Sequence, residues 1–181
     1  MKRGLTITAV AAVLLAVMAS AGAAPGGDVP VTAGSTELSF TGTLTITGFG
    51  VLNKQLSLEG TLNGPLSSSN AGVEVDLSDL AVQLPLDEVV ATCQPPQVTI
   101  TTQATSIPIP GFDDITLERL TLLRTVDPAD TALIDQVCQA VDDLANQPGK
   151  RKGKRLAEAA DALNALGGTW QLAPVEPPTT G

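Results

Sequence analysis

Carboxylate side chains are the main groups in this sequence that could take part in catalysis. The candidates are Asp76, Asp79, Asp87, Glu88, Asp113, Asp114, Asp142 and Asp143. Two such groups facing each other across a cleft could supply the acid and base of a glycosidase. Adjacent residues of a strand point to opposite faces, however, and Asp142 and Asp143 fall on the solvated side of a predicted helix. The spacing therefore favours surface carboxylates. A calcium site at Asp113 and Asp114, or from Asp76 to Asp79, is a weaker alternative without EF-hand spacing.

The chain of 181 residues contains no histidine and no tyrosine. Imidazole is the usual base of serine and cysteine hydrolases and a common metal ligand, because its proton affinity lies near neutral pH. Those sites cannot be assembled from this sequence. Nothing in it matches a nucleotide-binding loop, a zinc motif or a serine-nucleophile elbow either. We therefore expect a protein that is not an enzyme and that uses no cofactor or metal ion.

The N-terminus has the three parts of a secretory signal peptide. Lys2 and Arg3 supply the positive charge, residues 5–19 form an uncharged apolar run, and residues 21–23 have the small-x-small pattern that signal peptidase accepts. The apolar run is shorter than the roughly 20 residues that a membrane-spanning helix needs. We therefore expect residues 1–23 to be cleaved, leaving no transmembrane span. The rest of the chain would work outside the cytoplasm, either secreted or at the cell envelope or in a periplasm.

Cys93 and Cys138 are the only cysteines. Thiols outside the cytoplasm are oxidised, so export predicts a disulfide between them. The two residues lie far apart in the sequence and lack the Cys-x-x-Cys spacing of redox-active pairs. We therefore interpret the pair as a structural cross-link.

The charge balance is acidic, with one basic cluster. Loss of Lys2 and Arg3 lowers the basic count from 10 to 8 against 19 acidic residues, which excludes nucleic acid as a natural partner. Five of those eight basic residues are Lys150, Arg151, Lys152, Lys154 and Arg155. They could bind an anionic partner, such as lipid headgroups, wall polymers or an acidic protein. A solvated loop between two helices is the favoured interpretation.

Alternating hydrophobicity predicts an antiparallel sheet within residues 36–126. Leu38, Phe40, Leu44 and Ile46 point to one face and threonines to the other, which is typical of a half-buried strand. The phase changes around residues 48–50, which predicts a bulge or bend. Residues 53–54 lie between two apolar runs and predict a tight turn. We expect five to seven strands, forming a curved sheet or partial barrel.

Helices and flanking segments complete the predicted single domain at residues 36–168. Helix spacing of apolar residues, including Ile134, Val137, Cys138 and Val141, predicts a helix at residues 128–146 that covers the sheet and points Cys138 into the core. A shorter helix is predicted at residues 154–166. Composition predicts a flexible lead-in at residues 24–35 and a disordered tail at residues 169–181. The fold class is therefore α+β.

Four short segments carry a recognisable pattern: Phe40-Thr41-Gly42-Thr43, Gly60-Thr61-Leu62, Ala91-Thr92-Cys93 and Val137-Cys138-Gln139-Ala140-Val141. In these segments the chain resembles a group of small exported bacterial proteins of uncharacterised function. The resemblance covers residues 38–166 and implies export, paired cysteines and a sheet-plus-helix layout. It implies no function. The chain departs from the pattern in its acidic pair Asp142 and Asp143 and in its basic cluster.

Two roles remain open from the sequence. The first is an exported, non-enzymatic structural or interaction domain, acting as a cell-envelope component. The alternative is a binding protein for a lipid or other hydrophobic small molecule, held in a cavity between sheet and helix. The aliphatic composition favours a filled core, and therefore the first role.

Overall fold

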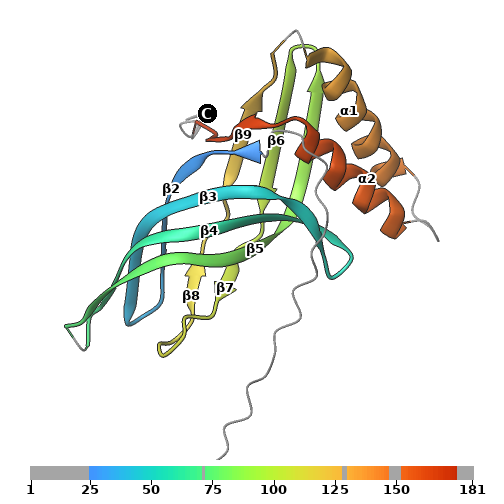
Figure 1. The fold of residues 1–181 in the computed structure, drawn as a ribbon. Coiled ribbons are helices and arrows are strands. Elements are labelled where there is room, and N and C mark those ends of the chain that lie inside the picture. The colour runs from blue at the N-terminus through green and yellow to red at the C-terminus, as the bar shows by residue number, and fades with distance from the viewer. Residues whose placement is uncertain (1–24, 71, 128–129, 147–151, 175–181) are drawn as a thin grey trace, which may run out of the picture.

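The computed structural model describes residues 25–70, 72–127, 130–146 and 152–174 (Figure 1). The predicted signal peptide, Lys150 and Arg151 therefore lie outside the described residues. The elements are β1 (Pro25–Gly26), β2 (Asp28–Gly34), β3 (Leu38–Leu52), β4 (Gln55–Ser68), β5 (Glu74–Cys93), β6 (Pro96–Thr102), β7 (Thr105–Ile107), β8 (Ile115–Leu117), β9 (Thr121–Thr125), α1 (Thr131–Asn146), α2 (Lys152–Ala165), β10 (Gly168–Thr169) and β11 (Gln171–Leu172).

The predicted α+β class is confirmed, but the number of strands is larger than predicted. In the described part of the chain, nine strands form one antiparallel sheet in the order β11-β9-β6-β5-β4-β3-β2-β8-β7, and β1 and β10 form a separate parallel pair. The prediction of five to seven strands was too low for two reasons. It left β2, β11 and part of β10 in segments expected to be irregular, and it gave no sign that β8 and β9 are separate strands with different partners.

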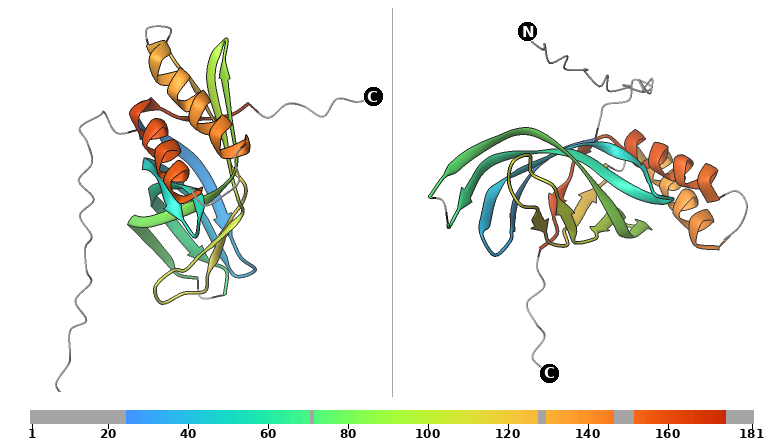
Figure 2. Two further views of the ribbon diagram at one scale, coloured as in Figure 1. Left: turned by 90° about the vertical axis from the view of Figure 1, so that its right-hand side faces the viewer. Right: turned by 90° about the horizontal axis from the view of Figure 1, so that it is seen from below.

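The long strand β5 bends the sheet over on itself. Its first part, up to Pro85, pairs with β4, and its last part, from Leu86, pairs with β6. A register shift between Leu86 and Glu88 marks the change of partner. Proline lacks an amide hydrogen and a bulge turns a strand, so both features suit a bend. The result is a curled half-barrel in which β6 to β9 cross beneath β2 to β5 (Figure 2).

The core lies on the concave side of this sheet and consists mainly of aliphatic side chains. Phe40, Leu44, Leu62, Ile100 and Leu122 are each 0% exposed. The sequence predicted that the helices would cover the apolar face. The sheet instead covers most of that face itself, because it curls, and the helices pack at one end, α1 against β5 and α2 against β3 (Figures 1 and 2). Within the described residues, neither helix is long and apolar enough to cross a membrane.

Two local predictions are confirmed. The turn between β3 and β4 consists of Asn53 and Lys54, whose φ angles of 50° and 64° match a two-residue hairpin turn of the right twist. The register of β3 against β4 shifts between Ile46 and Gly48, where the phase change predicts a bulge. Local signals sufficed in both places because the structure depends there on neighbouring residues only.

The described parts of both flanking segments differ from the prediction. The lead-in contains β2, in which Val29, Val31 and Ala33 are buried and alternate with exposed residues. The expected tail contains the end of β10 and all of β11, and between them Trp170 is 0% exposed. Residues 175–181 of that tail lie outside the described residues. Proline and glycine concealed these short strands, because composition does not show which neighbour a short strand can pair with.

The predicted helices are nearly correct at both ends. α1 is described at Thr131–Asn146, and residues 128–129 of the predicted start lie outside the description. α2 begins two residues earlier and ends one residue earlier than predicted. Such differences are normal where terminal turns fray.

Candidate functional site

A groove of about 340 Å³ lies between the bend of β5, the β3–β4 turn and the two helices. Its walls therefore come from four segments that are distant in the sequence. Six aliphatic side chains contribute to the lining: Leu56, Leu86, Val89, Val141, Leu144 and Leu156. Three of these belong to the buried core, and Val89, Val141 and Leu144 are only partly buried. The groove thus has an apolar surface of the kind and size that small-molecule sites use.

Charged residues of opposite sign lie on different walls of the groove. Lys54 comes from the β3–β4 turn and Lys152 is the first residue of α2, whereas Asp87 and Glu88 come from β5. Asp87 forms an ion pair with Arg119, with 2.9 Å between Oδ2 and Nη2. Within the described residues, no salt bridge involves Lys54 or Lys152. The lining of the groove therefore carries two lysines and two carboxylates on different segments, and one of the carboxylates, Asp87, already has a counter-charge.

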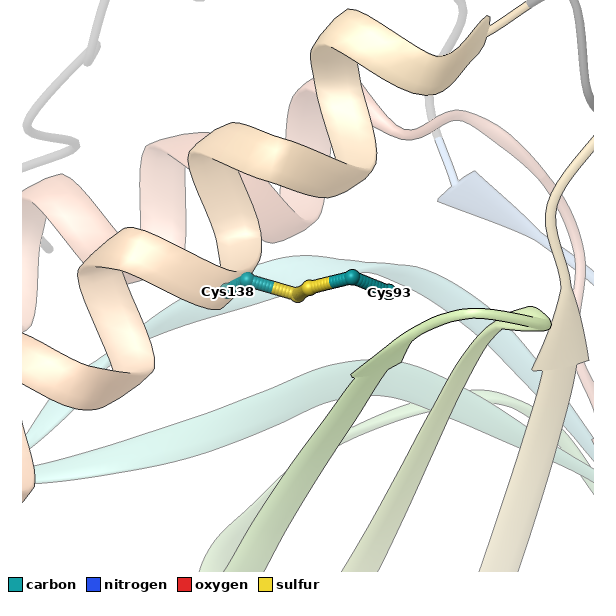
Figure 3. Close-up of a disulfide and its surroundings, with 2 residues drawn as sticks. All are labelled: Cys93 and Cys138. Atoms are coloured by element: carbon teal, nitrogen blue, oxygen red, sulfur yellow. A yellow bond between two sulfur atoms is a disulfide. The ribbon is translucent and has the colours of Figure 1, made fainter.

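A disulfide holds two walls of the groove together. Cys93, the last residue of β5, is bonded to Cys138 in the middle of α1, with 6.7 Å between their Cα atoms (Figure 3). This confirms the predicted pair. Cys138 packs against the core, where it was predicted to point, but it is only partly buried, and its partner Cys93 lies at the exposed end of β5. The cross-link fixes α1 beside β5.

The basic cluster does not form one continuous patch among its described members. Lys152 lines the apolar groove, and Lys154 pairs with Glu158, with 3.1 Å between Nζ and Oε1. Arg155 lines a second, more polar hollow of about 770 Å³ between the two helices. One turn of helix distributes these side chains around its axis, which a linear sequence does not display. Lys150 and Arg151 lie outside the described residues.

Three of the eight carboxylates considered for catalysis lie in separate surface contacts. Asp87 pairs with Arg119, and Asp114 accepts a hydrogen bond of 2.9 Å from the Ser106 hydroxyl. Asp79 adopts a left-handed φ of 50°, and its amide donates to the Asn63 side chain. Throughout the described ranges, no three His, Cys, Asp or Glu residues gather in a way that could hold a metal ion.

The prediction missed a buried arginine that joins the sheet to α2. Arg124 is 8% exposed, and its Nη2 donates a hydrogen bond of 2.7 Å to the carbonyl of Leu166, just after α2. A cation is favourable at that end of a helix. Burial lowers the pKa of the Arg124 guanidinium, and the Asp130 carboxylate opposes this shift. The sequence does contain a signal for this burial, because Arg124 alternates in phase with the buried Leu122 and Val126.

Comparison with protein-family models, curated proteins and solved structures finds no match for this chain. The resemblance to small exported bacterial proteins therefore stays an expectation, and the function must be argued from the groove itself.

Proposed function

We propose that this chain is an exported, non-enzymatic binding domain that holds a hydrophobic small molecule in the groove between sheet and helices. The groove is the observation that carries the proposal. The groove lies between sheet and helices, which is where a role in binding a hydrophobic small molecule requires a cavity. Aliphatic side chains make up much of its lining. Partly buried Val89, Val141 and Leu144 surround this hollow, and a hydrophobic ligand there would cover them.

The energetics of such a site favour an apolar ligand. Each methylene group moved from water to an apolar surface contributes about 0.8 kcal/mol. The interior of the half-barrel is occupied by its own side chains, such as Phe40 and Leu62. The ligand would therefore lie at the sheet–helix junction and not inside the sheet.

The disulfide supports both the location and the binding role. A cross-link of this kind persists in oxidising compartments, which agrees with export. It also holds the α1 wall beside the β5 wall before any ligand arrives. A preformed site loses less conformational entropy on binding, which raises affinity.

Binding can be tested with Nile red, an uncharged hydrophobic dye, added to the oxidised protein. We expect its fluorescence to rise on binding, and Leu144→Ser to weaken that binding by about three- to tenfold because apolar contact is lost. Leu133→Ser is the matched control, since Leu133 lies on the same helix and is partly buried but is not among the groove residues. Absence of dye binding, or equal loss in both variants, would contradict the proposal.

Native mass spectrometry of protein from its natural host separates the two candidate roles. A carrier should retain a bound apolar molecule that is released on denaturation. A structural module should show the mass of the processed polypeptide alone.

A further inference from the structure

We propose that the ligand of this groove is a single-chain anionic amphiphile, with its chain on the aliphatic lining and its head group between Lys54 and Lys152. This inference rests on the proposed binding function and specifies the class of ligand. The two lysines come from the β3–β4 turn and from the start of α2, and both line the groove. An anionic head group placed between them would be attracted by both positive charges.

The start of α2 provides an electrostatic reason. Its first turn contains Lys152, Lys154 and Arg155 and no acidic residue. The first amide groups of a helix point outward without intrahelical acceptors, and the helix dipole is positive there. Cations at this end are unfavourable unless a negative group lies nearby. Lys154 is paired with Glu158. Of the three basic residues in this turn, Lys152 is the one that lines the groove.

The acidic lining residues, Asp87 and Glu88, attract a cationic head group less strongly than the two lysines attract an anionic one. Asp87 already has a counter-charge in Arg119 at 2.9 Å, so Glu88 alone could attract a cationic group. Two lysines against one carboxylate make an anionic head group the better match. This preference for an anionic head group applies to the groove alone, since the whole chain carries a formal charge of −9.

The size and lining of the groove favour a ligand with one alkyl chain. Its volume of about 340 Å³ is near the lower end of the range for small-molecule sites. Two apolar lining residues, Leu56 and Leu156, lie two and four residues along the chain from Lys54 and Lys152, respectively. An alkyl chain can therefore leave the head group and continue directly onto apolar side chains.

The test uses three probes with the same twelve-carbon chain: dodecanoate, dodecyl maltoside and dodecyltrimethylammonium. Isothermal titration below the critical micelle concentration of each gives its dissociation constant. We expect dodecanoate to bind most tightly. Lys54→Gln and Lys152→Gln should each weaken dodecanoate by about two- to fivefold, as for exposed ion pairs, and leave dodecyl maltoside unchanged. Lys154→Gln is the control, because it removes the same charge from the same helical turn without lining the groove.

The outcomes separate this inference from the function on which it rests. Equal binding of all three probes, tighter binding of the cation, or equal effects of Lys152→Gln and Lys154→Gln would overturn the anionic head group, while Nile red binding could still stand. Failure of all three probes together with Nile red would overturn both. Added salt should weaken dodecanoate binding and leave dodecyl maltoside less affected, since exposed charges are screened.

Discussion

Asn164 and Phe49 exchange two hydrogen bonds although they lie 115 residues apart. The Phe49 amide donates to Oδ1 of Asn164 at 2.8 Å, and Nδ2 of Asn164 donates to the Phe49 carbonyl at 2.9 Å. The pairing of β3 with β2 ends at Thr45, and among the described residues no strand pairs with Phe49 on that side. The carboxamide therefore takes the place of a strand and attaches α2 to β3.

Replacing Asn164 by leucine should destabilise the fold. Asn164→Leu leaves the Phe49 amide and carbonyl without these partners in a partly buried position, which we expect to lower the free energy of unfolding by about 2 kcal/mol. Urea unfolding monitored by the fluorescence of Trp170, the single tryptophan, measures the change. Asn146→Leu at the exposed end of α1 is the control and should have little effect. Similar losses in both variants would show that the paired hydrogen bonds are unimportant.

The disulfide should contribute a large part of the stability. Cys93 and Cys138 are 45 residues apart, and closing a loop of this length in the unfolded chain corresponds to about 4 kcal/mol in the chain-entropy model. The Cys93→Ser/Cys138→Ser double variant should lose this amount relative to the oxidised protein. Reduction of the wild type by dithiothreitol should reproduce the loss. An unchanged urea midpoint in both experiments would exclude a structural role for the cross-link.

Two glycines near α2 should respond in opposite directions to alanine. Gly168 has a φ of +74°, and a Cβ atom there would overlap the Arg124 guanidinium that binds the Leu166 carbonyl. Gly168→Ala should therefore lower the free energy of unfolding by about 2 to 3 kcal/mol. Gly153 lies in α2 with no neighbouring atoms around its added Cβ, so Gly153→Ala should stabilise by about 0.5 to 1 kcal/mol. Thermal unfolding of both variants checks the sign, and a stabilising Gly168→Ala would contradict the buried contact.

The sequence by itself determined the local features of this protein. Alternation from Leu38 to Ile46, the Asn53 turn and the helical spacing of Ile134 and Val137 depend on neighbouring residues, so they could be predicted directly. The disulfide also followed, because two cysteines allow only one intramolecular pairing.

Only the tertiary structure decided where β5 changes partner and which segments surround the groove. The burial of Trp170 and Arg124 depends on contacts with Phe49 and Leu166, which lie far away along the chain. Lys54, Asp87, Leu144 and Lys152 likewise meet only after the sheet has curled. Hydrophobic periodicity tells which side of an element faces inward, but not which other element it will face. That choice is made by packing of the whole chain.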